Sequence, residues 1–202
     1  MHLSDITVLD FETTGLNPQH DRVIEIAVVR CDDTGIVSQF STLVKTDRPL
    51  APKITELTGI TDEDLKAGMD EETSFRILNR LIGSNTIVAH NAAFDLAFLH
   101  YGLMRFAGRS FSNDFIDTLT IARDRQTYPH TLTEMCKRYG VQLNGSHRAL
   151  NDVVACWELL QQMNREKPVD GYVNQLGYVA KHGAPAWSPP HAELRSLTLK
   201  YA

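Results

Sequence analysis

Four carboxylates and one histidine occur in three short motifs, LDFETTG (9–15), HNAAFD (90–95) and HRALND (147–152). In chain order these residues are Asp10, Glu12, Asp95, His147 and Asp152. Four carboxylates in one pocket would repel each other and could not all stay ionised without compensation. Hard divalent cations with oxygen ligands are the usual compensation, and Mg²⁺ commonly keeps phosphate oxygens among its ligands. The five residues therefore indicate metal-assisted phosphoryl chemistry.

The first motif follows a predicted buried strand, ITVLDF (6–11), which is apolar and β-branched. Alternate residues of a strand share a face, so we expect Asp10 and Glu12 to point the same way. Two acids that end an apolar strand are costly to desolvate unless they bind something. The simplest alternative is a strand that runs out into a polar loop. The haloacid-dehalogenase pattern Asp-x-Asp-x-Thr is disfavoured because its second acid is a glutamate here.

Alternating and apolar runs predict the elements between the first two motifs. VIEIAVVRCD (23–32) and IVSQFSTLVK (36–45) flank a glycine-containing turn and predict an antiparallel hairpin. Three helices are expected next: 53–58 ended by Gly59, a short one after the capping signal Thr61-x-x-Asp64, and an amphipathic one over 71–82 capped by Asp70.

The second motif joins a short apolar strand, TIVAH (86–90), to a helix. Asn91 can cap this helix, which is expected over 92–107. Asp95 then falls within or just beyond the first turn. The helix dipole favours an acid there, so a purely structural role for Asp95 is the alternative.

The third motif opens a helix predicted over about 148–163, which places Asp152 in its first two turns and His147 at or just before its start. A lone histidine at a helix start is usually structural, so His147 becomes a catalytic candidate only beside the other motifs. Between the second and third motifs, the sequence predicts a strand over 115–118, a helix through Arg125, and a helix from a capping box at Thr131–Glu134 to Gly140.

The chain has 202 residues, of which 43% are hydrophobic, and a formal net charge of −5. This composition supports one folded domain with an appendage and excludes global disorder. A nucleic-acid enzyme ordinarily has a basic surface, but two divalent ions would bring the charge from −5 to −1. Basic residues exceed acids by three between 105 and 148, which suits a polyanion; a solvated helical face is the simpler interpretation.

The cysteines and the lengths of the apolar runs indicate the cellular compartment of the protein. Cys31, Cys136 and Cys156 lie inside apolar patterns and predict reduced, buried thiols rather than a metal site. No apolar run approaches the roughly 20 residues needed to cross a bilayer. Acidic residues near the N-terminus disfavour a signal peptide. We therefore expect a cytoplasmic protein without membrane association.

Residues 165–202 differ in character from the rest of the chain. They hold four of the eight prolines, half of the six tyrosines and no phenylalanine. We expect a helix over 171–182 ended by Gly183, and then an extended segment over 184–190. The sequence thus predicts a main domain over 1–164 and a C-terminal appendage over 165–202 that packs on the domain or docks on a partner.

The chain resembles the DEDDh (DnaQ-like) family of 3′→5′ exonucleases, and within it the group that includes the proofreading epsilon subunit of bacterial DNA polymerase III. The matching stretches follow the family order and spacing and cover residues 6–160 nearly end to end. They are VLDFETTGL (8–16), VIEIAVV (23–29), LTGIT (57–61), AHNAAFDLAFL (89–99), DTLTIAR (117–123), LTEMCKRYGV (132–141) and HRALND (147–152).

This resemblance implies an α/β, ribonuclease H-like fold with a mixed five-stranded sheet flanked by helices. It also implies two divalent metal ions, Mg²⁺ with Mn²⁺ able to substitute. Asp10, Glu12 and Asp152 would hold one ion. Asp10 would bridge to the second ion, and Asp95 would contribute directly or through water.

The implied activity is hydrolysis at DNA 3′ ends, preferably single-stranded, with release of nucleoside 5′-monophosphates. His147 would be the general base, Thr13 would contact the terminal nucleotide through its backbone, and Phe94 would pack under a base or sugar. An RNA-trimming exoribonuclease, like ribonuclease T or oligoribonuclease, is the alternative within this class. A non-catalytic nucleic-acid-binding module is the alternative outside it, disfavoured because all five positions are present. A polymerase partner and a homodimer both stay open.

Overall fold

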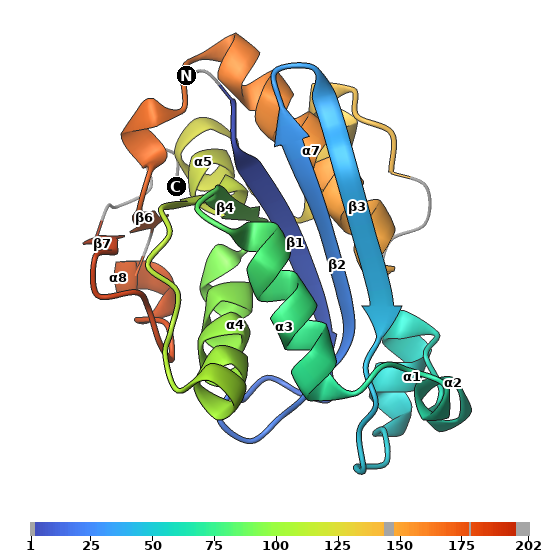
Figure 1. Cartoon of the computed structure of the whole chain (residues 1–202). Helices are drawn as coiled ribbons and strands as arrows, with labels where there is room; N and C mark the ends of the chain where they lie inside the picture. The colour runs from blue at the N-terminus through green and yellow to red at the C-terminus, as the bar shows by residue number, and fades with distance from the viewer. Residues whose placement is uncertain (1–2, 144–147, 178, 197–202) are drawn as a thin grey trace.

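The structure is a computed structural model that describes residues 3–143, 148–177 and 179–196. Its centre is a sheet in the order β3-β2-β1-β4-β5 (Figure 1). The strands are β1 (Ile6–Thr13), β2 (Val23–Asp32), β3 (Gly35–Leu43), β4 (Thr86–Ala89) and β5 (Phe115–Asp117). β2 is antiparallel to both β1 and β3, whereas β4 is parallel to both β1 and β5. The prediction of a mixed five-stranded sheet is confirmed.

The hairpin of β2 and β3 forms where the alternating pattern predicted it. Asp32 accepts hydrogen bonds from the backbone N–H and the hydroxyl of Thr34 at 2.7 and 2.6 Å, which closes the turn. Gly35 has a φ of 128°, a conformation that residues with a side chain rarely adopt. β3 thereby folds back antiparallel to β2, and β2 lies between β3 and β1.

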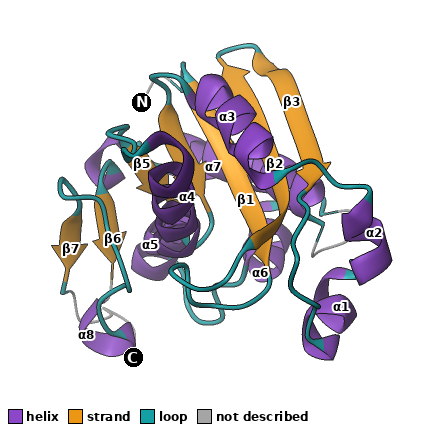
Figure 2. Cartoon of the chain, turned by 60° about the horizontal axis from the view of Figure 1, so that its bottom comes forward, coloured by secondary structure: helices purple, strands orange, loops and turns teal. Residues whose placement is uncertain are grey.

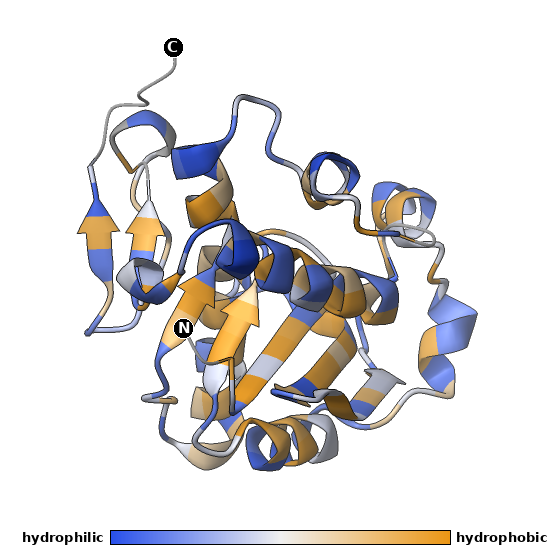
Figure 3. Cartoon of the chain, turned by 90° about the horizontal axis from the view of Figure 1, so that it is seen from above, coloured by the Kyte–Doolittle hydropathy of each residue, from blue (hydrophilic) through white to orange (hydrophobic). Residues whose placement is uncertain are grey.

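Helices cover both faces of the sheet. Figure 1 shows α3 (Glu71–Ile82) and α4 (Ala92–Ala107) in front of it and α7 (Ala149–Glu166) behind it. Ile6 and Val8 pack on the α7 side, and Leu9 and Phe11 pack with α3 and α4. Figure 3 shows the apolar strands enclosed between helices that turn hydrophilic residues outward.

The two short helices lie beyond the end of β3, at one corner of the molecule (Figure 2). They are α1 (Pro52–Thr58) and α2 (Asp62–Lys66). Gly59 ends α1 with a φ of 73°, and Thr61 and Asp64 form the predicted reciprocal capping box of α2. Asp70 caps α3 by accepting from the N–H of Thr73 at 2.8 Å, also as predicted. The sequence predictions for these helices are confirmed.

The start of α4 differs from the prediction. Asn91 precedes the helix, but it has left-handed backbone angles (φ 75°, ψ 47°) and its side chain makes no capping hydrogen bond. The carboxylate of Asp117 takes over this role, since it accepts from the N–H groups of Asn91 and Ala92 at 3.0 and 3.1 Å. A residue 25 positions away therefore caps α4.

Three helices follow on the rear side: α5 (Thr118–Arg125), α6 (Leu132–Tyr139) and α7. Thr131 caps α6, but Glu134 pairs with Arg138 at 2.9 Å, so only half of the expected capping box forms. α7 runs to Glu166, three residues beyond its predicted end. Residues 144–147 precede it outside the described ranges.

The C-terminal segment is not the single helix predicted over 171–182. It contains a 3₁₀ turn (Asp170–Tyr172), β6 (Gln175–Gly177), α8 (Val179–His182) and β7 (Glu193–Arg195). Asn174 interrupts the helix with a φ of 59° because its side chain accepts from the N–H of Phe115 at 3.0 Å. Tyr172 and Leu176 are buried in the core, so this segment packs against the edge of the sheet.

The cysteines are buried and free, as predicted. Burial raises the pKa of Cys31 to about 12 and that of Cys136 to about 11, so both stay protonated thiols at neutral pH. Among the described helices, none is long and apolar enough to cross a bilayer.

Candidate active site

Three of the predicted ligands meet at the end of β1. Oxygen atoms of Asp10, Glu12 and Asp152 all lie within 4.8 Å of one another. Asp10 and Glu12 share the face of β1 that α7 covers, because alternate strand residues point the same way. Asp152 lies on the first turn of α7 and faces them. The fold therefore brings together two motifs separated by about 140 residues.

Asp95 reaches the same end of β1 from the opposite layer. It lies in the first turn of α4, is 2% exposed, and accepts a hydrogen bond from the N–H of Phe11 at 3.1 Å. Phe11 separates Asp10 from Glu12, so this bond fixes Asp95 beside both. The negative charge of Asp95 in turn raises the pKa of Asp10.

The electrostatics of this cluster are unfavourable without a cation. Burial, followed by repulsion from Asp95, Glu12 and Asp152, raises the pKa of Asp10 well above its usual range. Burial and repulsion from Asp152 and Glu25 raise the pKa of Glu12 to about 7. Burial also raises the pKa of Asp95, although the hydrogen bond from Phe11 opposes this. Such carboxyls hold protons at a pH where ordinary ones are ionised.

The donor set fits a hard divalent cation. All of its ligand atoms are carboxylate oxygens, which Mg²⁺ and Mn²⁺ prefer and which softer metals do not select. A bound cation would also relieve the repulsion that raises these pKa values. The structure brings Asp10, Glu12 and Asp152 together, and Asp95 lies beside them through its hydrogen bond with the N–H of Phe11.

Glu25 is a fifth acid of the site that the sequence reasoning missed. It lies directly opposite Glu12 in the β1–β2 register and is 2% exposed. One oxygen accepts from the N–H of Ala149 at 3.3 Å, and the other lies 3.5 Å from the guanidinium of Arg148. Glu25 therefore holds the start of α7. Its signal in the sequence is an acid inside the apolar run VIEIAVV.

Asp117 is a second missed residue, and it supports Asp95. Besides capping α4, it accepts from the N–H of Leu119 at 3.1 Å and the hydroxyl of Thr120 at 2.6 Å at the start of α5. One buried carboxylate thereby anchors two helix starts. The first turn of α4, which carries Asp95, is fixed relative to β5.

The two predicted substrate residues flank the acidic cluster. Thr13 is buried, and its hydroxyl donates to the carbonyl of Gly15 at 2.7 Å, so it shapes the loop after β1. Phe94 packs against Phe98 with ring centroids 4.9 Å apart. It helps line a pocket of about 200 Å³ together with Leu16, which is 84% exposed, and Pro185. Leu16 was missed as a site residue, although an apolar residue in a polar turn is its signal.

Two other expectations have different outcomes. His147 lies outside the described residues, so its position stays a prediction. The basic excess between 105 and 148 is mostly used inside the protein: Arg105 pairs with Glu71, Arg138 with Glu134, and Arg148 with Glu25. Arg125 donates to the carbonyl of Met163 at 2.6 Å. These contacts favour the simpler interpretation of that excess.

Comparisons with known proteins show the family of this chain. The family model described as "Exonuclease" (RNase_T) matches residues 7–160. DNA polymerase III PolC-type of Bacillus cereus is 36% identical over 167 residues, and that of Bacillus subtilis is 36% identical over 169. These alignments cover 82% and 81% of this chain but only 12% of each relative. The chain thus spans about one eighth of the length of these relatives.

Solved structures share the fold. Exonuclease I of E. coli in complex with a dT13 oligonucleotide superposes with a TM-score of 0.73 at 21% identity, over 82% of this chain and 42% of that one. Exonuclease X in complex with 5′ overhanging duplex DNA gives a TM-score of 0.65 at 28% identity, over 80% and 92%. These are ribonuclease H-like exonucleases, so the predicted fold class is confirmed.

The family model covers more than half of the chain, and the polymerase relatives exceed 30% identity over most of it. DnaQ-like exonucleases use divalent metals, and the carboxylate cluster of this chain is suited to hold them. The chain therefore belongs to the DnaQ-like family of 3′→5′ exonucleases, which are phosphodiester hydrolases.

Proposed function

We propose that the chain is a metal-dependent exonuclease that removes nucleotides one at a time from DNA 3′ ends and releases nucleoside 5′-monophosphates. The observation that carries this proposal is the carboxylate cluster of Asp10, Glu12 and Asp152, with Asp95 beside it. DNA is favoured over RNA because the similar polymerases are DNA polymerases, and the similar exonuclease structures contain DNA. The complex with dT13 supports a preference for single strands.

Each carboxylate has a proposed part in binding two ions, Mg²⁺ with Mn²⁺ able to substitute. Asp10, Glu12 and Asp152 would hold one ion, and Asp10 would hold the second together with Asp95, which would contribute directly or through water. Bound there, two such ions supply positive charge to the attacking and the leaving oxygen of the phosphodiester. Glu25 and Asp117 bind no ion in this proposal, but they hold α7 and α4 so that Asp152 and Asp95 face β1.

His147 has the proposed part of general base. It directly precedes Arg148, whose guanidinium lies 3.5 Å from Glu25 at the start of α7. A ring nitrogen of neutral His147 would take a proton from the attacking water. The new bond forms between the water oxygen and phosphorus, and the bond from phosphorus to the 3′-oxygen breaks. The departing 3′-oxygen takes up a proton from solvent, so the shortened strand ends in a 3′-hydroxyl and the released nucleotide carries the 5′-phosphate.

The terminal nucleotide is proposed to bind beside Phe94. The pocket of about 200 Å³ offers an aromatic ring and the exposed Leu16 as apolar surfaces for a base or sugar. Stacking on an aromatic ring tolerates every base, since each base has a π-face. Thr13 follows Glu12 of the cluster and precedes Leu16 of the pocket in the chain, which supports a contact of its backbone with the last nucleotide.

A digestion panel tests the proposal. The substrates are 5′-labelled single-stranded DNA, duplex DNA, a duplex with a mismatched primer end, and RNA, each with and without Mg²⁺. We expect a ladder that shortens from the 3′ end and mononucleotide products, fastest on single-stranded DNA. Chelator should abolish the activity and Mg²⁺ or Mn²⁺ should restore it, whereas Ca²⁺ should bind without good turnover because its geometry is looser.

Each other outcome of the panel has a meaning. Full activity in excess chelator would contradict the metal mechanism. Faster trimming of RNA than of DNA would establish the exoribonuclease alternative. If the wild type binds nucleic acid but cleaves none under conditions where metal binds, the non-catalytic binding module would be the remaining interpretation. The double variant Asp10→Asn/Glu12→Gln is the control for a contaminating nuclease.

The setting of the activity is also a proposal. We propose that it acts in the cytoplasm beside a replicative polymerase, because the similar region of the Bacillus relatives belongs to a polymerase polypeptide. Size-exclusion chromatography of the chain, alone and mixed with a bacterial DNA polymerase III catalytic subunit, tests this. A peak at twice the mass of the chain alone would instead establish the homodimer.

A further inference from the structure

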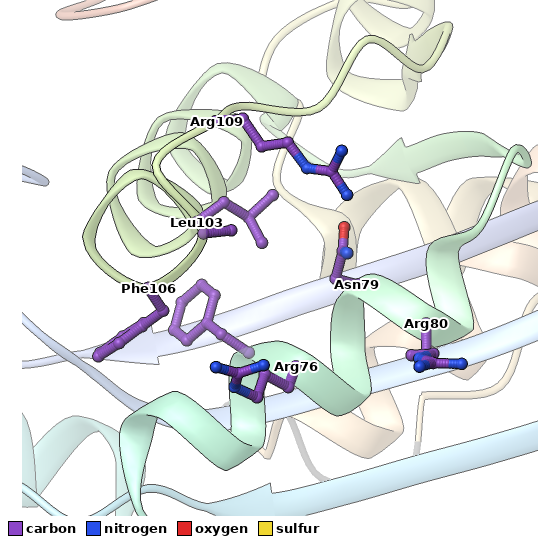
Figure 4. A pocket seen from close by; sticks show the side chains of 8 residues that line it. Arg76, Asn79, Arg80, Leu103, Phe106 and Arg109 are labelled. Carbon is purple, nitrogen blue, oxygen red and sulfur yellow. The ribbon is translucent and has the colours of Figure 1, made fainter.

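A second concave site lies between α3 and α4, built from residues that the acidic cluster does not use. It is a pocket of about 340 Å³ (Figure 4). Arg76, Asn79 and Arg80 line it from α3, Leu103 and Phe106 from α4, and Arg109 from the chain just beyond α4. Figure 4 shows Arg109 and Asn79 directed toward one another across the opening.

The rim of this pocket carries an excess of positive charge. Arg76 pairs with Glu72 one helical turn away at 2.6 Å. The side chains of Arg80 and Arg109 make no hydrogen bond or ion pair with any part of the chain that the structure describes. The neighbouring Arg105 is already paired with Glu71. Two guanidinium groups that line this pocket therefore have no carboxylate partner among the described residues.

The floor of the pocket is apolar and aromatic. Phe75 and Leu103 are 1% and 4% exposed and form its base. Phe106 is half-buried and lies 6.1 Å from Phe75 between ring centroids. A ligand that fits this pocket combines an anionic group for the guanidinium rim with a flat or apolar body for the aromatic wall. Guanidinium groups match phosphate oxygens in geometry and charge.

The pocket and the acidic cluster are separate sites. Both use α4, but Asp95 lies in its first turn and Leu103 follows eight residues later, about 12 Å along the helix axis. Stacked nucleotides of one strand are spaced by about 3.4 Å. A span of about 12 Å therefore corresponds to about four stacked nucleotides.

We propose that this pocket binds a nucleotide phosphate, with Arg80 and Arg109 on the phosphate and Phe106 against the base or sugar. The choice of a nucleotide rests on the proposed exonuclease function. The same chemistry has two sources, a nucleotide several positions from the 3′ end of the substrate strand or a free mononucleotide such as the product. The pocket gives the exonuclease a second hold on its substrate in the first case and a product-sensing site in the second.

Binding is measured by fluorescence anisotropy in excess chelator, where no cleavage occurs, with 5′-fluorescein-labelled strands of two and twelve nucleotides. In a third arm, the binding of dTMP is measured directly by calorimetric titration. The variant is Arg80→Ala/Arg109→Ala. Lys53→Ala/Lys167→Ala removes the same charge from exposed positions outside the pocket and is the matched control. Arg80→Lys/Arg109→Lys keeps the charge but loses the forked geometry.

If the ligand is the substrate strand, the alanine variant should bind the twelve-nucleotide strand about tenfold more weakly than the wild type. The slope of log K against log salt concentration should also be smaller by about 1.4, since each of the two lost phosphate contacts contributes about 0.7. The dinucleotide should be unaffected, and the lysine variant should lie in between. A mononucleotide ligand predicts instead that the alanine variant loses the directly measured binding of dTMP. Equal binding by wild type, alanine variant and control in every arm would overturn the proposal.

Cleavage of the dinucleotide in Mg²⁺ separates this proposal from the exonuclease function. Arg80 and Arg109 are exposed and lie outside the carboxylate cluster, so the alanine variant should cleave the dinucleotide at the wild-type rate. If the wild type cleaves no substrate, the exonuclease function fails. If it cleaves but the pocket variants bind every ligand normally, only the pocket assignment fails. An unchanged melting temperature confirms that the variants are folded.

Discussion

Glu12 and Glu25 face each other across the β1–β2 pair, and both point toward the start of α7. Glu12 belongs to the carboxylate cluster, whereas Glu25 is bound to the N–H of Ala149 and lies next to Arg148. Like charges opposite each other in a sheet are destabilising. The repulsion between Glu12 and Glu25 is offset because Glu25 has partners at the start of α7. The same contacts of Glu25 position Asp152, which lies in the first turn of α7.

Glu25→Ala should therefore weaken metal binding although Glu25 is not a proposed ligand. Groups that orient metal ligands typically contribute about 10–100-fold to metal affinity, and we expect a loss in this range for Mn²⁺. Glu25→Gln should lose much less, because an amide oxygen can still accept from Ala149. Calorimetric titration with Mn²⁺ measures both variants. Equal affinity in Glu25→Ala and the wild type would remove Glu25 from the site.

The metal-free protein should lose stability as the pH rises. A carboxyl whose pKa is higher in the folded than in the unfolded chain takes up a proton on folding, so the free energy of unfolding falls as that proton is lost. For Glu12, burial and the charges of Asp152 and Glu25 raise the pKa from 4.5 to about 7. The loss should develop across this window and reach about 3 kcal/mol from Glu12 alone.

Denaturant unfolding in chelator between about pH 4.5 and 8 measures this effect, with Glu12→Gln as the control. We expect the wild type to be destabilised relative to Glu12→Gln as the pH rises. Mn²⁺ should restore the stability of the wild type most strongly at the upper end, where it no longer competes with protons. Parallel curves for the two proteins would show that Glu12 ionises normally.

The elements that carry the site were predictable because their signals are local. The run ITVLDF predicted β1, which continues two residues further to Thr13, and capping residues predicted the bounds of α3 and α6. The same reasoning placed Asp10 and Glu12 on one face of β1, and the structure joins them to Asp152. Periodicity and caps depend on neighbours within a few residues, so one sequence contains what they need.

The errors concern contacts between distant residues. Asn91 has the sequence of a capping residue, yet Asp117 caps α4 from the end of β5. Glu25 was taken as part of an apolar strand because its partner Ala149 lies 124 residues away. The predicted helix over 171–182 is interrupted at Asn174, whose side chain accepts a hydrogen bond from the N–H of Phe115. No pattern along the chain identifies a partner that only the tertiary fold supplies.

The C-terminal segment should contribute to stability more than to chemistry. Trp187 stacks on His100 of α4 with centroids 4.1 Å apart and meets Phe111 edge-on. Trp187→Ala should cost about 1–3 kcal/mol, which lowers the melting temperature of a chain of this size by about 2–4 °C per kcal/mol. The turnover number on a dinucleotide should not change, because Trp187 does not contact the carboxylate cluster.

Thermal unfolding of Trp187→Ala and Trp187→Phe tests this, since phenylalanine keeps part of the stacking. An unchanged melting temperature in the alanine variant would mean that the segment is not held at this point. A point substitution is sharper than removal of everything after residue 165. That truncation would also delete Val169, Tyr172 and Leu176 from the core.

His147 is the proposed general base and not a proposed metal ligand. Its substitution should therefore lower the turnover number without weakening metal binding. As the general base it must be neutral, and an ordinary histidine has a pKa near 6.5. The turnover number should therefore rise with pH through one ionisation and then level off. His147→Ala should lose about 10²–10⁴-fold in turnover, the usual contribution of a general base, and the pH dependence of that ionisation should disappear. Mn²⁺ affinity should stay normal because imidazole is not a proposed ligand, whereas Asp152→Asn should weaken it.

His191→Ala, a histidine of the C-terminal segment, is the control. A His147→Ala enzyme with a near-normal rate and the wild-type pH profile would exclude His147 from the mechanism.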